Sequence, residues 1–467
     1  MRGEGETIVT FDPATEEPLA EIAGASAGQV DAAADAAAAA FGPWSGLTAD
    51  QRGDHLDAFA DALEERRAQL VETIVADVGT PVALCEALQV AAPLIHMRNY
   101  ARLARLDRTE ALGPHLSPVA SDSLVSYRPV GPVAAIVAYN YPFSLAVIKV
   151  GAALAAGCTV VMLPSPQAPL TSLIIAEAAL EAGLPAGVLN VILGGAEVSR
   201  RLIDHPAIRR VSFTGSVEVG RAVMERAARR LTGSILELGG KSAAIVAPGV
   251  DLARIVEPLH LRYARNAGQG CQSPTRLLVH EDDLAEFEKL SVDAYARIAV
   301  GDPGDASTVV GPLISAAHRD RVEGFVTEAL AEGGRTIAGG GRPAGLERGW
   351  YVNPALVGGV SPDSRIAREE IFGPVAVVLP YRDLDEAVRI ANDSELGLAA
   401  YVFAASLAEA FAIGEQLEAG SVYINGGGGF REDAPMGGVK NSGLGREIGE
   451  WGVREYLEPC HVQWALT

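Results

Sequence analysis

The segment NAGQGCQSP, residues 266–274, places Cys271 among glycines and small polar residues. A thiolate is a strong nucleophile that can bond covalently to a carbonyl carbon. Most cysteines instead act as small apolar side chains, and reactivity depends on the surroundings of the sulfur. This segment alone leaves two interpretations of Cys271 open, a nucleophile and an inert thiol.

Other polar residues lie where a covalent thiol mechanism needs them. Glu237 stands in LELGGKS, where a predicted strand enters a glycine turn, so its carboxylate could act as a general base or cap the turn. Asn140 in AYNYP follows a short apolar strand, and its amide could donate to an oxyanion or satisfy a turn. FTGSVEVG (213–220) puts Gly215 and Ser216 at a strand-to-helix junction, which favours a phosphate, although any glycine turn does so weakly.

Strands and helices alternate from residue 132 onward. The predicted strands cover 133–138, 159–163, 187–193, 210–214 and 234–238, and helices cover 143–156 and 170–182. This first series predicts a parallel sheet flanked by helices, an architecture that binds dinucleotides. A second series runs from about 243 to 425, with strands near 244, 277, 376, 401 and 422.

The N-terminal part is predicted to be mostly helical. Helical patterns cover 27–41, 48–77 and about 80–104, with a loop at GPWSG, residues 42–46. A strand is predicted over 122–131. The last segment, HVQWAL, is predicted as a strand that needs a partner from elsewhere in the fold.

Composition limits the class of protein. A chain of 467 residues exceeds one hydrophobic core, which predicts two or three domains. The net charge of −21 argues against a nucleic-acid partner, because phosphate binding needs a basic surface. The uncharged stretch 129–148 contains Gly131, Pro132 and Pro142, which predict a strand, a turn and a helix instead of a membrane span.

The four cysteines, Cys85, Cys158, Cys271 and Cys460, show no CxxC spacing and have no His-rich neighbour. We therefore expect neither a metal site nor a disulfide framework. With no secretory signal visible in MRGEGETIVTFDP, the expected location is the cytoplasm, which keeps thiols reduced.

Six motifs occur in order along the chain: YNYP (139–142), FTGSVEVG (213–220), ELGGKS (237–242), NAGQGC (266–271), EEIFGPV (369–375) and APMGGVKNSGLGRE (434–447). With these motifs the sequence resembles the aldehyde dehydrogenase family along essentially its whole length. The resemblance implies an α/β fold with a Rossmann-like cofactor-binding domain, an α/β catalytic domain and a small β oligomerisation arm.

The family's architecture gives expected domain boundaries. They are 1–111 and 129–238 for the NAD(P)-binding domain, 239–452 for the catalytic domain, and 112–128 and 453–467 for the arm. Because an arm with open strand edges calls for a partner chain, a homodimer or homotetramer is expected.

The resemblance also implies a reaction, the NAD(P)-dependent oxidation of a small-molecule aldehyde to a carboxylic acid. Cys271 would attack the aldehyde carbon, while the Asn140 amide and the Cys271 backbone N–H hold the oxyanion. Hydride transfer to the nicotinamide would leave a thioester, which water activated by Glu237 would hydrolyse. Lys149 matches a family lysine that assists proton transfer, and an isolated charge in its apolar helix needs a partner.

Further positions match the family's cofactor site. Glu370 matches the carboxylate that holds the nicotinamide ribose, with Phe372 packing nearby, and Gly215 and Ser216 match the pyrophosphate turn. Tyr139 takes the place of a family tryptophan near the adenosine side. The implied cofactor set also includes Leu163, Ser165, Gly220 and Leu238.

The substrate tunnel implied by the resemblance is lined by Tyr141, Ile148, Phe430 and Met436. Tyr141 and Met436 stand where phenylalanine is frequent, and Ile148 where some members have tryptophan. Fewer aromatic walls and the glycine run 426–429 would leave room for a medium or bulky apolar aldehyde. The alternative is that Met and Ile repack the same volume.

The adenosine side departs from the family pattern. In VVMLPSPQAP, Leu163 replaces a lysine and Pro166 a glutamate, both of which address the adenosine ribose. Loss of these hydrogen bonds predicts weaker cofactor binding, and loss of the glutamate removes the repulsion of a 2′-phosphate. No basic residue attracts that phosphate here, so NAD is favoured and NADP stays open.

Other functions compete with this one. A scaffold or binding protein on a catalytically retired fold would explain the lost ribose contacts, but it would not need Cys271, Glu237 and Asn140. A thiol hydrolase would use the same cysteine without a nucleotide. A CoA-acylating enzyme would not need Glu237 to activate water.

Overall fold

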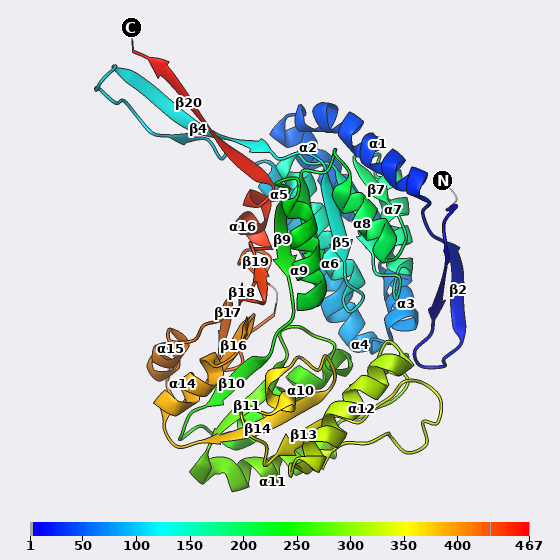
Figure 1. The fold of residues 1–467 in the computed structure, drawn as a ribbon, viewed down its shortest axis with the longest axis vertical. Helices are drawn as coiled ribbons and strands as arrows, with labels where there is room; N and C mark the ends of the chain where they lie inside the picture. Colours follow the sequence, from blue (N-terminus) through cyan, green and yellow to red (C-terminus); the bar gives the residue numbers. More distant parts are fainter. Residues whose placement is uncertain (1–2, 430, 467) are drawn as a thin grey trace.

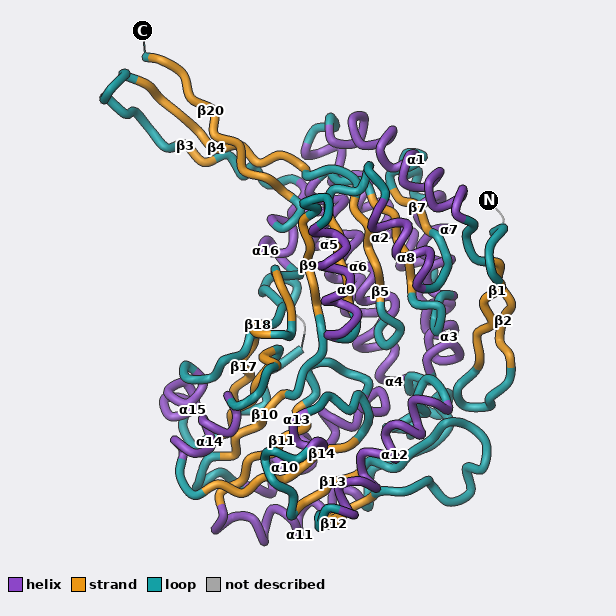
Figure 2. The backbone as a smooth tube through the Cα atoms, in the orientation of Figure 1, coloured by secondary structure: helices purple, strands orange, loops and turns teal. Residues whose placement is uncertain are grey.

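The computed structural model describes residues 3–429 and 431–466. Its two large sheets follow one another along the long axis of the molecule, and a β arm projects from one end (Figure 1). Helices flank both large sheets (Figure 2). The fold class is therefore α/β, as the sequence predicted.

The first sheet is the Rossmann-like one, with strand order β19-β9-β8-β5-β6-β7. Its strands are β5 (Val133–Val137), β6 (Val160–Pro164), β7 (Leu189–Val191), β8 (Arg210–Thr214), β9 (Gly233–Glu237) and β19 (Gly443–Leu444). Neighbouring strands run parallel except β9 and β19, which are antiparallel. The edge strand β19 thus brings the C-terminal part of the chain against the end of β9.

Both faces of this sheet are covered by helices. One face carries α2 (Ala49–Glu65), α3 (Arg67–Val78), α5 (Ala92–Ala104), α6 (Pro142–Ala156) and α7 (Leu170–Glu181), and the other carries α1 (Ala27–Ser45), α8 (Ala196–Asp204) and α9 (Val217–Ala228). Val133, Ala135 and Val137 of β5 face the first group, whereas Ala134 and Ile136 face the second. Because both faces of the sheet are buried, the sequences of these strands are continuous apolar runs and do not alternate between apolar and polar residues.

The second sheet has the order β12-β13-β14-β11-β10-β16-β17 and is parallel except for the β12–β13 pair. Its strands are β10 (Ser242–Val246), β11 (Pro274–His280), β12 (Arg335–Gly339), β13 (Ala355–Gly358), β14 (Val375–Tyr381), β16 (Ala399–Phe403) and β17 (Ser421–Ile424). The helices of this half are α10 (Leu252–Ala264), α11 (Leu284–Tyr295), α12 (Ala316–Ala331), α13 (Arg365–Arg368), α14 (Leu384–Asn392) and α15 (Leu407–Gly414). One large apolar core joins the two sets.

Short elements complete the chain after β10, and of these α16 packs against α5 and α6 of the first sheet. They are the 3-10 segments η2 (Arg265–Gly268) and η3 (Glu281–Asp283), the paired strands β15 (Leu396–Gly397) and β18 (Val439–Lys440), and helix α16 (Gly449–Arg454).

The β arm consists of β3 (Glu110–Ala111), β4 (Ser121–Pro129) and β20 (Leu457–Ala465). β20 pairs antiparallel with β4 from Leu457 opposite Pro129 to Ala465 opposite Ser121. The predicted C-terminal strand is therefore confirmed, and its partner is the strand predicted over 122–131. The arm extends away from the body of the chain (Figure 1).

The loop predicted at 42–46 is wrong. Helix α1 continues to Ser45 with Pro43 inside its last turn. Trp44 is 1% exposed and packs against His55, so burial of its ring holds the chain in the helix.

The long helices predicted over 48–77 and 80–104 are interrupted. Arg66, with a non-helical ψ of 11°, separates α2 from α3. The second region comprises the single turn α4 (Val82–Leu84), the π-helical segment η1 (Cys85–Ala91) and α5. The hairpin of β1 (Thr7–Phe11) and β2 (Pro18–Ala23) was not predicted.

Within the described residues, every helix is too short or too polar to cross a membrane. The same residues contain no cluster of three or more His, Cys, Asp or Glu that could hold a metal ion.

Candidate active site

Cys271 lies between η2 and β11 and is half-buried. Burial raises the pKa of its thiol to about 12, and the carboxylates of Glu370 and Glu237 act in the same direction. The backbone N–H groups of Cys271 and Gln272 oppose this shift, because they stabilise the thiolate. The thiol is therefore held protonated until a base takes its proton.

Asn140, at the end of β5, is 5% exposed and reaches the cysteine loop. Its Nδ2 donates to the Gln269 carbonyl oxygen at 2.9 Å. The backbone carbonyl oxygen of Asn140 accepts from Asn266 Nδ2 at 2.9 Å and from Gln89 Nε2 at 3.3 Å. One amide proton of Asn140 is thus used to fix the side chain, and the second is left for a ligand.

These bonds belong to a larger buried network that the sequence analysis missed. Gln89 Nε2 also donates to Thr80 Oγ1 at 2.7 Å, and Thr80 Oγ1 donates to Asn266 Oδ1 at 2.7 Å. Tyr139 donates its hydroxyl proton to Gln269 Oε1 at 3.1 Å. The π-helical turn η1 supplies Gln89, and such turns occur frequently at functional sites. No local pattern in the sequence indicates contacts between residues this far apart.

Glu237 is the last residue of β9 and is 4% exposed. Burial raises its pKa well above the usual range, and the negative charge of Glu447 adds to the shift. Lys149 and Arg446 act in the opposite direction. Its Oε1 has no hydrogen-bond partner in the structure, so this carboxyl is free to accept a proton from a reacting group.

Lys149 is fully buried in α6, and the partner expected for it is present. Its Nζ lies 2.5 Å from Glu447 Oε1 and donates to Ser212 Oγ at 3.1 Å. The sequence analysis missed Glu447, although it is the last residue of the motif APMGGVKNSGLGRE. A buried lysine needs a carboxylate as its counter-ion, and the glutamate that ends this motif was available in the sequence as a candidate for that partner.

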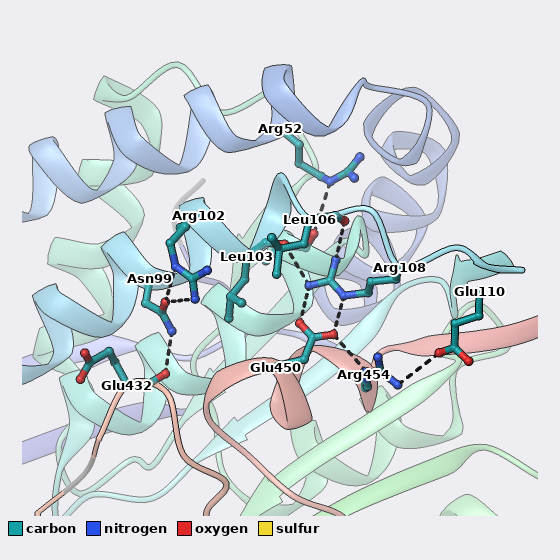
Figure 3. Close-up of polar contacts among 11 residues, drawn as sticks. Arg52, Asn99, Arg102, Leu103, Leu106, Arg108, Glu110, Glu432, Glu450 and Arg454 are labelled. Carbon is teal, nitrogen blue, oxygen red and sulfur yellow. Dashed lines mark hydrogen bonds and ion pairs between the residues drawn. The ribbon is translucent and has the colours of Figure 1, made fainter. Parts of the chain in front are cut away.

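Helix α16, which begins two residues after Glu447, is bonded to Arg108 in the segment that follows α5 and to Glu110 of the arm (Figure 3). Arg108 donates from Nε and Nη2 to the two carboxylate oxygens of Glu450, both at 2.8 Å. Arg454 also donates to Glu450, at 3.0 Å, and lies 3.7 Å from Glu110 in β3. These bonds hold α16 directly after Glu447.

Glu370 lies beside the turn between β9 and β10. The backbone N–H of Gly240 donates to its Oε1 at 2.9 Å. A Cβ atom on Gly239 would lie 2.3 Å from its Oε2, so glycine is required there for the carboxylate to approach. Burial raises its pKa to about 7, while the Gly240 N–H acts against the rise.

Phe372 and Tyr139 pack edge to face, with ring centroids 6.1 Å apart. The Tyr139 hydroxyl also bonds Gln269. The side of the cofactor on which Tyr139 lies stays a prediction. The negative charge of Glu370 also raises the pKa of Tyr139, after burial as the main cause.

The turn from β8 to α9 has the form expected of a phosphate site. The Gly215 backbone N–H donates to the Glu237 carbonyl oxygen at 3.1 Å, and Ser216 Oγ accepts from the Val219 N–H at 3.3 Å as the helix cap. Thr214 Oγ1 is buried without a partner at the same turn. Gly220 packs against Leu238 so closely that a Cβ atom on residue 220 would lie 2.4 Å from Leu238 Cδ2.

The residues at the end of β6 and just after it offer little to an adenosine ribose. Leu163 is 2% exposed and belongs to the apolar core. Ser165 Oγ accepts from the Gln167 N–H at 3.3 Å within its own turn, and Pro166 is exposed. None of these side chains is charged.

Two of the four expected tunnel residues lie in one apolar cluster. Ile148 and Met436 are 1% and 5% exposed and pack with Ile448. Their burial favours the alternative that they repack the volume of larger aromatic residues. Tyr141 is half-buried near Cys271, and Phe430 lies outside the described residues.

Comparisons with known proteins show the family of the chain. A model of the aldehyde dehydrogenase family matches residues 1–462. The chain is 43% identical to geranial dehydrogenase of Castellaniella defragrans over 415 residues, 88% of this chain and 85% of that protein. It is 39% identical to 3-succinoylsemialdehyde-pyridine dehydrogenase of a Pseudomonas species over 459 residues, 97% of this chain and 94% of that protein.

Solved structures show the same fold. An NADP-dependent enzyme of E. coli matches with a TM-score of 0.96 at 34% identity, covering 100% of this chain and 96% of that one. A mutant of aldehyde dehydrogenase C from Pseudomonas syringae, complexed with NAD+ and octanal, matches with a TM-score of 0.94 at 37% identity, covering 99% and 94%. The chain therefore belongs to the aldehyde dehydrogenase family and is an NAD(P)-dependent enzyme that oxidises an aldehyde to a carboxylic acid.

Proposed function

We propose that Cys271 is the nucleophile of this reaction and that Asn140 and Glu237 serve it directly. The observation that carries this proposal is the hydrogen bond that joins Asn140 to the cysteine loop. Asn140 Nδ2 donates to the backbone carbonyl oxygen of Gln269, two residues before Cys271, at 2.9 Å. The free N–H of the Asn140 amide and the Cys271 backbone N–H would hold the oxyanion formed when sulfur attacks the carbonyl carbon.

Glu237 is the general base in this proposal. A carboxyl with a raised pKa is a better proton acceptor near neutral pH than an ordinary glutamate. It would take the proton of the water that hydrolyses the thioester on Cys271. The Lys149–Glu447 pair lies close enough to shift its pKa and would carry the proton onward.

The residues present fit a nicotinamide dinucleotide. The unpartnered Thr214 Oγ1 and the N-terminus of α9 suit a pyrophosphate, with Gly215 and Ser216 at the turn. Glu370, with Phe372 beside it, would accept from ribose hydroxyls. When bound, the cofactor accepts the hydride from the aldehyde carbon. Because no basic side chain stands at 163–166 to attract a 2′-phosphate, we propose a preference for NAD.

The substrate that we propose is an aldehyde with an apolar stem. Ile148 and Met436 supply buried apolar surface on one side, and Tyr141 lies near Cys271. The octanal complex of the Pseudomonas syringae relative and the name of the geranial dehydrogenase support an apolar stem by similarity.

We also propose the domain boundaries and assembly implied by the family. Residues 1–111 and 129–238 would form the cofactor-binding domain, 239–452 the catalytic domain, and the arm of β3, β4 and β20 a dimer or tetramer contact. The edges of a three-stranded arm leave backbone groups unpaired, which supports pairing with another copy. Light scattering that shows a monomer would contradict this assembly.

The cysteine usage of the sequence supports the cytoplasm as the location of the protein.

The direct test is nucleotide reduction followed at its absorbance band with an aldehyde panel. Cys271→Ala should abolish the activity, whereas Cys460→Ala, a half-buried cysteine in β20, should keep it. Activity retained in Cys271→Ala would exclude the proposed nucleophile. Ester hydrolysis that needs no nucleotide and exceeds aldehyde oxidation would favour a thiol hydrolase instead.

A further inference from the structure

Gln89 has no part in the mechanism proposed above, yet its side chain reaches the backbone of Asn140. It stands in the π-helical turn η1 and is fully buried. Its Nε2 donates to the backbone carbonyl oxygen of Asn140 at 3.3 Å and to Thr80 Oγ1 at 2.7 Å. Both N–H bonds of the Gln89 amide are thereby used, and both partners are buried as well.

Four hydrogen bonds close a ring through Gln89. Besides its own two bonds, Thr80 Oγ1 donates to Asn266 Oδ1 at 2.7 Å, and Asn266 Nδ2 donates to the Asn140 carbonyl oxygen at 2.9 Å. Because that carbonyl oxygen can only accept, both amides must turn their NH₂ groups towards it. Thr80 must then give its hydroxyl proton to Asn266, so the direction of every bond in the ring is fixed.

The ring holds one end of a strained turn in the cysteine loop. Asn266 and Ala267 both have a left-handed φ of 53°, and Gly268 follows with a φ of 72°. Residues with a Cβ atom rarely adopt this conformation, and it persists only where the surrounding structure enforces it. Ala267 has no polar side-chain atom, so the hydrogen bonds that enforce the turn through a side chain are those of Asn266.

The turn in turn holds the side chain of Asn140. It leads into Gln269, whose backbone carbonyl oxygen accepts from Asn140 Nδ2 at 2.9 Å, two residues before Cys271. Asn140 is therefore held twice, by its backbone carbonyl in the ring and by its side-chain amide at the cysteine loop. Loss of a bond in the ring would shift the Asn140 amide relative to Cys271.

We propose that Gln89 and Thr80 are positioning residues for the Asn140 amide that holds the oxyanion. They act through the Asn140 backbone and through Asn266, and neither touches the substrate. The proposal rests on the proposed function, because it takes Asn140 as an oxyanion donor. A donor that is fixed before the substrate arrives needs no reorganisation during the reaction, and a small misplacement of such a group lowers the rate strongly.

The test is a double-mutant cycle between Gln89 and Asn140. Asn140→Ala should lower kcat by ~10²- to 10³-fold, the usual effect of losing one oxyanion donor. Gln89→Met, which keeps a side chain of similar length, should lower kcat by roughly 10- to 100-fold and leave the Kd for NAD+ unchanged. Added to Asn140→Ala, the same change should lower kcat by less than about threefold, because the amide through which it acts is gone.

The outcomes of the cycle separate the two proposals. A wild-type kcat in Gln89→Met, or the same fold loss with and without Asn140, would overturn the positioning role and leave the oxyanion donor in place. A wild-type kcat in Asn140→Ala would contradict the proposed function itself. Glu86→Gln is the control, since Glu86 lies in the same turn η1 with its side chain exposed, and it should keep the wild-type kcat.

A second pair of variants covers the case in which Gln89→Met fails to fold. Thr80→Val removes the hydroxyl that links Gln89 to Asn266 and keeps the branched shape, whereas Thr80→Ser keeps the hydroxyl. We expect kcat to be roughly tenfold lower in Thr80→Val than in Thr80→Ser, with the same Kd for NAD+ in both. Equal kcat values in the two variants would overturn the proposal.

Discussion

The surroundings of Cys271 divide into two sets of charges. The carboxylate set is Glu237, Glu370 and the Glu447 of the Lys149 pair, and the arginine set is Arg262 and Arg265. Glu370 is held by the backbone N–H of Gly240 and Glu447 by the buried Lys149, whereas Glu237 Oε1 is buried without a partner. Glu370 and Glu237 raise the pKa of the thiol. Arg262 lies over the rings of Tyr401 and Tyr423, and among the described residues neither arginine forms an ion pair with a carboxylate. Two of the three carboxylates are thus paired with a donor, whereas Glu237 Oε1 and Arg262 Nε are buried without a partner.

The largest expected effect is on the carboxylate set. Glu237→Gln should lower kcat by ~10²- to 10⁴-fold, the range for loss of a general base. Stopped-flow measurement should show one rapid turnover of nucleotide reduction and then a stall, because the thioester on Cys271 is no longer hydrolysed. A steady-state rate within about tenfold of the wild type, with no burst, would mean that another residue activates the water.

The buried pair predicts a large change in stability. Lys149→Met leaves Glu447 buried without its counter-ion and should lower the free energy of unfolding by about 3–5 kcal/mol. The double variant Lys149→Met, Glu447→Gln should recover part of that loss in urea denaturation. The second single variant is Glu447→Gln. If its loss and that of Lys149→Met simply add in the double variant, the pair does not interact as described.

The pH dependence of the Cys271 thiol tests the effect of the carboxylate set on its pKa. Because burial and the two carboxylates raise the pKa of Cys271 to about 12, its alkylation rate should climb across pH 6–10 without a plateau. Removing a negative charge lowers a thiol pKa, so Glu370→Gln should react faster than the wild type at pH 9. That difference should fade below about pH 7, where Glu370 itself takes up a proton. A slower reaction of Glu370→Gln than of the wild type at pH 9 would mean that Glu370 does not raise the pKa of the Cys271 thiol.

The smallest expected effect lies outside both sets, at the adenosine side. Leu163→Lys should restore a ribose hydrogen bond and lower the Kd for NAD by roughly tenfold. Leu163→Met is the control, as it keeps an apolar side chain of similar volume. No change with lysine would mean that the buried position of Leu163 keeps any side chain there from the ribose. A higher wild-type kcat/KM with NADP than with NAD would contradict the proposed preference.

The sequence predicted what local patterns and motifs encode. The alternation of strands and helices predicted the parallel first sheet and five strands of the second, but not β12 and β13. The apolar run around Lys149 indicated the buried partner that Glu447 supplies. The buried network through Gln89 and Asn266 could not be predicted, since its members meet only in three dimensions. The same holds for the continuation of α1 past Pro43, which depends on burial of Trp44.

The arginine set was missed for a different reason. Arg265 directly precedes the motif NAGQGC, yet an arginine in a charged protein is ordinarily a solvated or ion-paired side chain. The structure shows that, among the described residues, it forms no ion pair with a carboxylate.

Covalent capture tests the central claim, that Cys271 is the nucleophile, most directly. Glu237→Gln would be mixed with NAD+ and p-methylbenzaldehyde, quenched in acid and analysed by peptide mass spectrometry. The account predicts one acyl group, on the peptide that contains Cys271 and on none that contains Cys85, Cys158 or Cys460. Nucleotide reduction with the acyl group on another residue, or with no acyl group at all, would contradict it.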